Sequence, residues 1–346
     1  MSKFRVGYSA YLKRPDGRPG FPAYDLSPLG GDPRIDLVEL PQGQPLAAGM
    51  LGQFDAVVLL GEQVSAPSLQ GVGRLRLIAR MGVGYDTLDV PACTSADVAI
   101  AITPPGVRRP MATTVLAFLL ALSHRLMAKD RISRKGAPGW NERLDQHGTG
   151  LVGRTLGIVG LGNIGAEVAR LAKPFELRLI AHDPYVSPDL PRALGVEMLA
   201  LDDVFRQADF LSLNCPLNEE TRYLANARRL ALMKPTAFLI NTARGPVVEQ
   251  AALVATLKTG RIAGAGLDVF DPEPPPADDP ILKLDNALFG PHALGWSDQM
   301  FATMAEVNRA QIAAVMAGQT PEHVVNREVL TRPGFLAKLK RNEGWG

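Results

Sequence analysis

Short apolar segments separated by polar or helix-forming stretches run along most of the chain and predict parallel α/β layers rather than a β-sandwich. In the first part of the chain the predicted strands are residues 4–8, 35–40, 55–60, 75–79 and 98–101. From residue 155 onwards the predicted strands are 155–159, 177–182, 196–199, 209–213, 236–240, 262–267 and 287–289. The second series predicts a doubly wound sheet, whose ligands bind where the strands end.

Two longer helices are predicted between and after these series. An apolar segment of about 111–126 follows the break at Thr103-Pro104-Pro105-Gly106, which we interpret as an interdomain hinge, and an amphipathic helix at 298–316 returns to the first domain. Residues 8–33 are rich in Pro, Gly and Asp and predict a long loop of unknown role. The basic tail from Asn326 is expected to be loosely held.

Composition narrows the class of protein. The 346 residues suffice for two domains, and 46% of them are hydrophobic. Lys and Arg number 37 against 35 Asp and Glu, without a basic run, so we expect neither a nucleic-acid nor a membrane partner. The two cysteines are far apart and the first residues lack the apolar segment of a signal peptide, so we expect a cytoplasmic protein.

The segment Gly160-Leu161-Gly162-Asn163-Ile164-Gly165 carries the first functional signal. It follows a predicted strand and opens a predicted helix, the context in which this glycine spacing binds the pyrophosphate of a dinucleotide at a helix N-terminus. Asp183 ends the next predicted strand, where a carboxylate accepts the adenosine ribose hydroxyls and repels a 2′-phosphate. These residues predict binding of NAD in preference to NADP, whereas a glycine turn without a ligand is the simpler alternative.

Polar side chains follow four later strands, at the edge where a doubly wound sheet binds its ligands. The candidate segments are 214–216, 241–246, 268–274 and 291–296. Arg244 offers a planar fork for a carboxylate, and a histidine held by a carboxylate suits proton transfer, so with a nicotinamide this set suits interconversion of 2-hydroxy and 2-oxo acids. Taken singly, Arg244, Glu273 and His292 could each have a structural role instead of a catalytic one. No spacing of His, Cys or carboxylate residues indicates a metal site.

These motifs together resemble the D-isomer-specific 2-hydroxyacid dehydrogenases, the family of phosphoglycerate dehydrogenase and glyoxylate/hydroxypyruvate reductase. The resemblance covers roughly residues 50–325. It implies a Rossmann nucleotide domain at 105–296, a smaller flavodoxin-like substrate domain at 1–104 and 297–330, and a C-terminal tail at 331–346. It also implies a homodimer built through the nucleotide domains.

The resemblance assigns roles by position. Arg244 binds the substrate carboxylate, His292 is the acid/base and Glu273 orients it, while Val83 and Gly84 are backbone donors to the substrate. Asp268 is expected near the nicotinamide carboxamide. Further cofactor contacts are expected from Gly160, Gly162, Asn163, Ile164, Gly165, Asp183, Cys215, Pro216, Thr221, Thr242, Ala243 and Gly295.

Some positions depart from the family pattern. Ala112-Thr113 stands where Ala-Glu is usual, His292 is followed by Ala-Leu-Gly-Trp, and Arg108-Arg109 lies close to the hinge. These features leave the substrate open. Three other functions remain as alternatives: an NAD-binding corepressor, which the presence of Arg244, Glu273 and His292 disfavours, a dehydrogenase of a one-carbon or inorganic donor, and a pure binding module, which is the least favoured.

Overall fold

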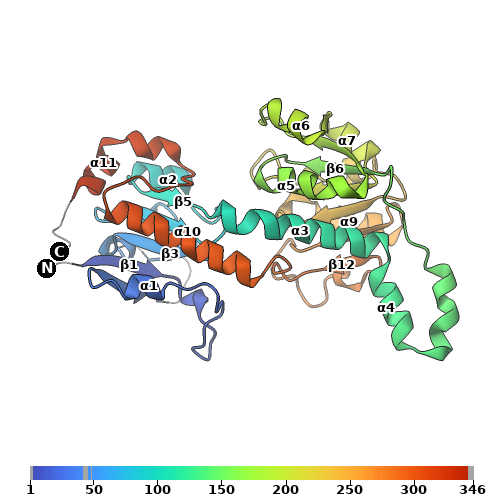
Figure 1. The fold of residues 1–346 in the computed structure, drawn as a ribbon, viewed down its shortest axis with the longest axis horizontal. Helices are drawn as coiled ribbons and strands as arrows, with labels where there is room; N and C mark the ends of the chain where they lie inside the picture. The colour runs from blue at the N-terminus through green and yellow to red at the C-terminus, as the bar shows by residue number, and fades with distance from the viewer. Residues whose placement is uncertain (1–2, 42–45, 48, 342–346) are drawn as a thin grey trace. The chain divides into compact units, whose positions relative to one another are not determined.

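The computed structural model describes residues 3–41, 46–47 and 49–341 (Figure 1). The chain divides into two compact units. The first unit combines Met1–Val107 with Trp296–Gly346, and the second is Arg108–Gly295.

The first unit is built on a five-stranded parallel sheet. Its strands are β1 (Phe4–Tyr8), β2 (Ile35–Glu39), β3 (Ala56–Leu59), β4 (Leu77–Arg80) and β5 (Ala99–Ala101). Their order, β2-β1-β3-β4-β5, is that of flavodoxin-like folds. The five strands predicted from the apolar pattern are confirmed, with ends that differ by one or two residues.

Helices cover both faces of this sheet (Figure 1). On one face α2 (Val90–Ser95) contributes the buried Cys93 to a core that contains Leu59, Ile78 and Ile100. On the other face α10 (Asp298–Met316) packs against β4, and Asn308 donates from Nδ2 to the Arg80 carbonyl. The helix predicted at 298–316 is confirmed.

The stretch 8–33, expected to be a long loop, is tied to α10. After the end of β1 it contains a 3-10 turn at Ala10–Leu12, an isolated antiparallel bridge between Lys13 and Pro19, and the short helix α1 (Ser27–Gly30). The Tyr24 hydroxyl donates to Oδ1 of Asn308 at 2.5 Å, and the Phe21 ring lies 5.1 Å from Trp296 and 4.9 Å from Phe301. These contacts hold the stretch against the N-terminal half of α10.

The expectation of a loosely held tail from Asn326 is wrong for residues 326–341. Asn326 is buried and donates to the Val98 carbonyl, and α11 (Pro333–Lys340) buries Phe335 and Leu339. Lys338 donates to four backbone carbonyls, and burial lowers its pKa to about 8. The basic composition of the tail suggested a segment exposed to solvent. In the structure the Lys338 ammonium group is instead turned inward, where it donates hydrogen bonds to backbone carbonyls. Residues 342–346 lie outside the described residues.

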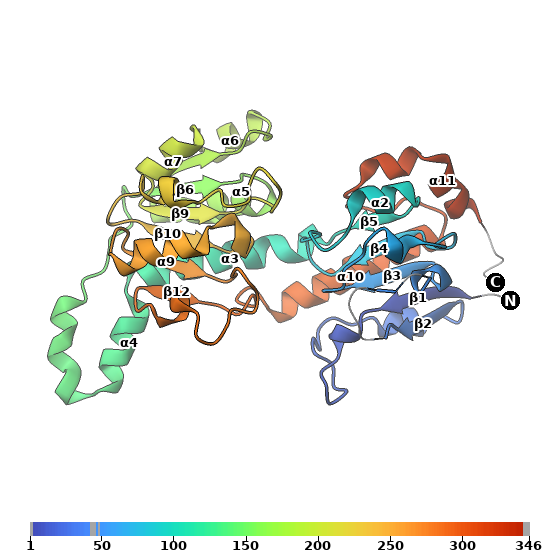
Figure 2. The same ribbon diagram turned by 180° about the vertical axis from the view of Figure 1, so that it is seen from behind.

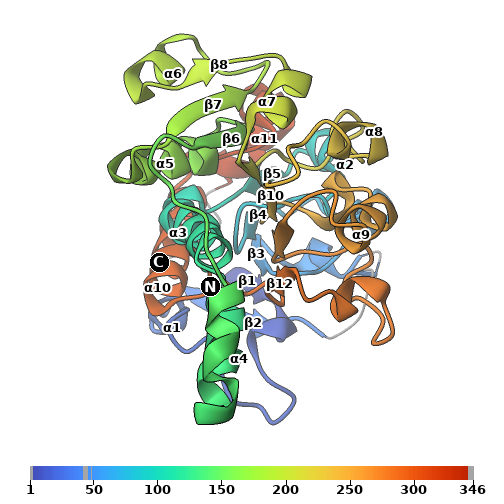
Figure 3. The same ribbon diagram turned by 90° about the vertical axis from the view of Figure 1, so that its right-hand side faces the viewer.

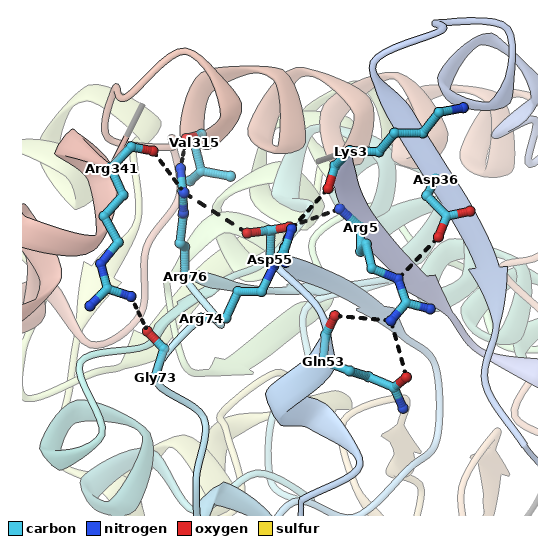
Figure 4. A network of polar contacts seen from close by, with 10 residues as sticks. All are labelled: Lys3, Arg5, Asp36, Gln53, Asp55, Gly73, Arg74, Arg76, Val315 and Arg341. Carbon is cyan, nitrogen blue, oxygen red and sulfur yellow. Dashed lines mark hydrogen bonds and ion pairs between the residues drawn. The ribbon is translucent and has the colours of Figure 1, made fainter. Parts of the chain in front are cut away.

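A buried carboxylate links the sheet of the first unit to the C-terminal segments (Figure 4). Oδ2 of Asp55 accepts from the Arg5 amide at 2.8 Å and from Nε and Nη2 of Arg74 at 2.9 and 2.7 Å. Arg76, also buried, lies 3.9 Å from Oδ1 of Asp55 and donates to the carbonyls of Val315 and Arg341. The network therefore joins β1 and the residues just before β3 and β4 to α10 and to the end of α11.

Asp55→Asn should destabilise the protein by about 2 kcal/mol, because hydrogen bonds to a charged acceptor contribute about 1.5–3 kcal/mol and the amide keeps the volume while losing the charge. Urea unfolding followed by circular dichroism measures this. Asp36→Asn is the matched control, since the side chains of the Arg5–Asp36 ion pair at 3.0 Å are 31% and 45% exposed, whereas Asp55 is fully buried, and it should cost less than about 0.5 kcal/mol. Equal losses in both variants would contradict the role of burial.

The second unit contains a seven-stranded parallel sheet. Its strands are β6 (Thr155–Val159), β7 (Arg178–His182), β8 (Glu197–Met198), β9 (Phe210–Leu213), β10 (Phe238–Asn241), β11 (Gly264–Leu267) and β12 (Ala287–Phe289). The strands lie in the order β12-β11-β10-β9-β6-β7-β8. Successive strands are added on one side of β6 up to β8 and then on its other side from β9 onwards, as in a Rossmann fold. The predicted α/β architecture and its strands are confirmed.

Two helical layers enclose this sheet (Figures 2 and 3). On one face α3 (Pro104–Ser123) and α5 (Asn163–Ala172) share a core, and on the other face α7 (Leu201–Gln207) and α9 (Gln250–Lys258) share a second one. Shorter helices are α6 (Asp189–Leu194) and α8 (Ala227–Leu230). Helix α3 begins at Pro104, where the sequence predicted a break, because prolines are tolerated in a first helical turn.

The segment after α3 leaves the sheet of the second unit. Helix α4 (Leu126–Arg134) and a 3-10 segment, Ala137–Asp145, pack on each other and project from the unit (Figures 1 and 2). No single helix among the described residues is long and apolar enough to cross a membrane, and α3 and α4 meet that criterion only together, as a pair bent by 58°.

Candidate active site

The glycine turn predicted from the sequence connects β6 to α5. Gly160 has φ of +88°, and a side chain on Gly165 would lie 2.0 Å from the Gly160 carbonyl oxygen, so neither position admits another residue without movement. Gly162 is the N-cap of α5 and has no atom within 4 Å of its would-be Cβ. Open space therefore faces the N-terminus of a ten-residue helix, which fits the pyrophosphate of a dinucleotide.

Asp183 follows β7 and lies beside this turn. Its Oδ2 accepts from the Leu161 amide at 2.8 Å, and its Oδ1 accepts from the amides of Tyr185 and Val186 at 2.9 and 3.1 Å. Asp183 lines a cavity of about 390 Å³ together with Gly162 and Asn163. The residues predicted for the pyrophosphate and the ribose therefore share one cavity.

The loop after β9 brings the next predicted residues to the same edge. The Asn214 amide donates to the Val159 carbonyl at 2.7 Å, and a side chain on Gly160 would meet the Cys215 amide, so this loop closely approaches the glycine turn. Thr221 closes the loop by donating to the Pro216 carbonyl at 2.6 Å. Burial raises the pKa of the Cys215 thiol to about 11, which makes it a poor nucleophile.

Arg244 follows β10 in a tightly constrained turn. The buried Asn241 accepts from the Ala243 amide at 3.1 Å and donates to the Arg244 carbonyl at 2.9 Å. A side chain on Gly245 would lie 1.6 Å from the Phe270 carbonyl oxygen, so the turn packs directly against the loop after β11. The half-buried Arg244 also donates from Nη1 to the Ala243 carbonyl at 2.7 Å.

His292 and Glu273 form the pair that the motif order predicted. Nδ1 of His292 lies 2.8 Å from Oε2 of Glu273, whose Oε1 accepts from the Phe270 amide at 3.0 Å. Burial raises the pKa of Glu273, but the bond and charge of His292, the Phe270 bond and the Arg244 charge outweigh it and hold the pKa below its usual value. Glu273 is therefore an anion at neutral pH, and its contact leaves Nε2 of His292 for a substrate.

The backbone of His292 adopts the left-handed conformation, with φ of +55°, which is uncommon for a residue with a side chain. Asp268, at the end of β11, accounts for it. Its buried carboxylate accepts from the amides of Ala293 and Leu294 at 3.2 Å, and a side chain on Gly290 would lie 2.2 Å from Oδ1. Asp268 thus holds the loop that carries His292, a role that the sequence did not indicate.

Asp268→Ala should lower kcat/KM by about tenfold or more, because each hydrogen bond to a charged acceptor contributes about 1.5–3 kcal/mol and the loop would relax from its strained conformation. Steady-state kinetics at pH 7 measure this. Asp271→Ala is the control, since the half-buried Asp271 lies in the neighbouring loop and its carboxylate accepts from the Tyr223 hydroxyl at 3.2 Å. The control should stay within about twofold, and a similar loss in both variants would contradict the positioning role.

The remaining predicted residues lie in different places. Thr242 and Ala243 belong to the Arg244 turn, and Gly295 ends the second unit with its would-be Cβ 2.7 Å from Sδ of Met111. Val83 and Gly84 belong to the first unit, where the Arg80 Nε donates to the Gly84 carbonyl at 2.9 Å. The described residues contain no group of three His, Cys, Asp or Glu side chains that could hold a metal ion.

Comparisons with known proteins identify the family of the chain. The model of the D-isomer specific 2-hydroxyacid dehydrogenase NAD binding domain matches residues 116–293. Glyoxylate reductase of Korarchaeum cryptofilum is 40% identical over 302 residues, which are 86% of this chain and 91% of that relative. Glyoxylate reductase of Pyrococcus horikoshii is 38% identical over 292 residues, covering 82% and 86%.

Solved structures are similar over almost the whole chain. A Thermus thermophilus protein has a TM-score of 0.77 and 31% identity, covering 93% of this chain and 99% of that one. A glyoxylate reductase from Paecilomyes thermophila has a TM-score of 0.79 and 26% identity, covering 95% and 100%. With the Rossmann sheet and its dinucleotide turn, these similarities place the chain in the D-isomer-specific 2-hydroxyacid dehydrogenase family, as an NAD-dependent oxidoreductase that acts on the CH–OH group of its donors.

Proposed function

We propose that the protein reduces small 2-oxo acids, with glyoxylate as the first candidate, and that Arg244, Glu273 and His292 carry the reaction. The observation that supports this most directly is the 2.8 Å contact between His292 and an ionised Glu273. The pair follows β11 and β12, next to the Arg244 turn after β10, in the order in which the three strands lie in the sheet. The names of the similar reductases support glyoxylate.

The chemistry divides among these residues. Arg244 pairs with the substrate carboxylate, because a guanidinium stays charged and binds a carboxylate through two parallel hydrogen bonds. His292 donates a proton from Nε2 to the oxygen of the 2-oxo group as it becomes an alkoxide, and Glu273 holds the ring at Nδ1 and stabilises the imidazolium. When bound, the nicotinamide supplies the hydride.

We extend the proposal to the cofactor and substrate contacts. The pyrophosphate lies at Gly160, Gly162, Asn163, Ile164 and Gly165, and the ribose lies at Asp183. The loops after β9, β10, β11 and β12 contribute the other predicted contacts, Cys215, Pro216, Thr221, Thr242, Ala243, Asp268 and Gly295. Val83 and Gly84 serve as backbone donors to the substrate, and Gly82 supports this turn through its φ of +117° and a bond from its amide to Thr103 Oγ1 at 2.9 Å.

A substrate panel tests the proposal. NADH oxidation is followed with glyoxylate, hydroxypyruvate, pyruvate, phenylpyruvate and branched 2-oxo acids, and at least one should be reduced with glyoxylate among the best. If another 2-oxo acid is reduced but glyoxylate is not, the proposed substrate is wrong. Failure with the whole panel, despite NADH binding, would overturn 2-oxo acid reduction and favour a one-carbon or inorganic donor.

We also propose a cytoplasmic homodimer. Large apolar side chains are exposed on and near the projecting segment of the second unit, namely Leu126, Met127, Trp140, Leu144 and Val152. A second copy of the chain would cover them, and burying such side chains stabilises a dimer. Both cysteines are free and buried, as suits a reducing compartment. Light scattering after gel filtration gives the oligomeric state, and a monomer at micromolar concentration would contradict the dimer.

A further inference from the structure

The cavity beside Asp183 carries positive charge that binding of NAD does not account for. Arg108, from the first turns of α3, and Arg170, from α5, line this cavity of about 390 Å³ together with Gly162, Asn163, Asp183 and Tyr185. The sequence shows no arginine next to Asp183, because Arg108 lies 75 residues earlier in the chain. The fold brings these side chains together.

The carboxylate of Glu167 forms ion pairs with three arginines near this cavity. Glu167 of α5 is buried, and its oxygens lie 2.9 Å from Nε of Arg109, 3.0 Å from Nη1 of Arg170 and 4.0 Å from Nε of Arg108. Arg108 therefore has the longest of the three contacts, and its side chain is about half exposed, at 52%. Two of these guanidinium groups, those of Arg108 and Arg170, line the cavity against one carboxylate, that of Asp183, so the charges of its lining are mainly positive.

The negative charge of Asp183, the carboxylate that lines the cavity, is partly compensated by its surroundings. Asp183 accepts three backbone N–H bonds, from Leu161 at Oδ2 and from Tyr185 and Val186 at Oδ1. Such bonds stabilise the negative charge, and the two cations that line the same cavity compensate it further. The electrostatic argument for excluding a 2′-phosphate, based on Asp183 alone, is therefore incomplete.

We propose that Arg108, supported by Arg170, binds the 2′-phosphate of the adenosine ribose, so that the protein accepts NADP as well as NAD. The pyrophosphate already has the N–H groups at the start of α5, and the two arginines line the same cavity as Asp183, the predicted ribose ligand. A phosphate ester pairs with a guanidinium through charge-assisted, bidentate hydrogen bonds. The proposal requires dinucleotide binding alone and is independent of the substrate.

Binding measurements test this proposal without turnover. Fluorescence titration gives the Kd of NADH and NADPH, and calorimetry gives the Kd of 5′-AMP and 2′,5′-ADP, which differ by the phosphate in question. The wild-type protein should bind NADPH within about tenfold of NADH. Arg108→Ala should weaken NADPH and 2′,5′-ADP by about tenfold or more, while NADH and 5′-AMP change by less than about threefold.

Arg109→Ala is the matched control. It removes the same charge from the neighbouring residue and from the same ion-pair cluster, but Arg109 does not line the cavity. It should leave the ratio of the NADPH and NADH dissociation constants within about twofold of wild type. Circular dichroism checks that both variants fold, and Arg108→Lys should restore part of the NADPH affinity.

Three results would overturn the proposal. The first is a wild-type Kd for NADPH more than about a hundredfold above that for NADH. The second is an equal loss of NADH and NADPH binding in Arg108→Ala, which would assign Arg108 to the pyrophosphate or to folding. The third is an equal change of the ratio in Arg109→Ala, which would indicate a general charge effect. None of them depends on the reduction of a 2-oxo acid, so failure of the proposed function is recognised separately.

Discussion

Arg244→Lys should lower kcat/KM for 2-oxo acid reduction by about a hundredfold or more. A planar guanidinium forms two parallel bonds with a carboxylate, whereas an ammonium is a point charge that cannot reproduce this geometry. Losing one charge-assisted hydrogen bond costs about 1.5–3 kcal/mol, which is about ten- to a hundredfold in rate, and misalignment of the substrate adds to it. Steady-state kinetics with the best 2-oxo acid of the panel measure the effect.

The Kd of NADH, measured by fluorescence titration, should stay near the wild-type value in Arg244→Lys. The turn around Arg244 is held by Asn241 and by the close contact of Gly245 with the Phe270 carbonyl, neither of which needs the guanidinium. Arg261→Lys serves as the control, because Arg261 donates to the carbonyls of Met233 and Ala231 at another part of the sheet. If NADH binding and turnover fall together in Arg244→Lys, the residue supports the fold or the cofactor instead.

The sequence predicted most of the fold because parallel sheets buried on both faces produce recognisable apolar segments. Strands such as β6 and β9 are buried along their whole length, and the apolar pattern located them within one or two residues. The tail could not be predicted in this way. Its helix α11 is held by Lys338, whose amphipathic side chain is polar by composition but buried through bonds to four carbonyls.

The position of the candidate site residues was predictable, because the ligands of a doubly wound sheet bind at its strand ends. Because each of Arg244, Glu273 and His292 follows a predicted strand, this rule placed all three at one edge of the sheet. The structure adds the 2.8 Å contact between Glu273 and His292. Support of the His292 loop by Asp268 was not predictable, because it joins a side chain to backbone amides 25 and 26 residues later. The cationic cavity wall was missed for the same reason, since Arg108 belongs to a different element from Asp183.

His292→Gln should lower both reduction and oxidation by about a thousandfold, which is within the range that a general acid/base contributes. The loss should come in kcat, with the Kd of NADH nearly unchanged. His323→Gln is a matched control, because His323 also has a positive φ, of +59°, and lies 3.8 Å from a neighbouring Glu322. The control should keep wild-type rates, and a large loss there would indicate a general effect of replacing histidines.

Glu273→Gln tests how the pair works through the pH profile. The pKa of Glu273 is held below its usual value, so its negative charge faces Nδ1 of His292 at every pH where the enzyme is assayed near neutrality. That charge favours the imidazolium, which is the form that donates a proton in reduction. Removing it should shift the alkaline limb of kcat/KM for reduction to lower pH.

The oxidative direction provides an independent check on the sign, because it needs the neutral imidazole as a base. Without the Glu273 charge, the neutral form persists to lower pH, so the acidic limb for oxidation should shift to lower pH as well. Both limbs report the same proton and must therefore move in the same direction. If Glu273→Gln leaves them in place, or moves them to higher pH, Glu273 serves only to hold the ring of His292 in position, and the electrostatic part of the proposed mechanism is wrong.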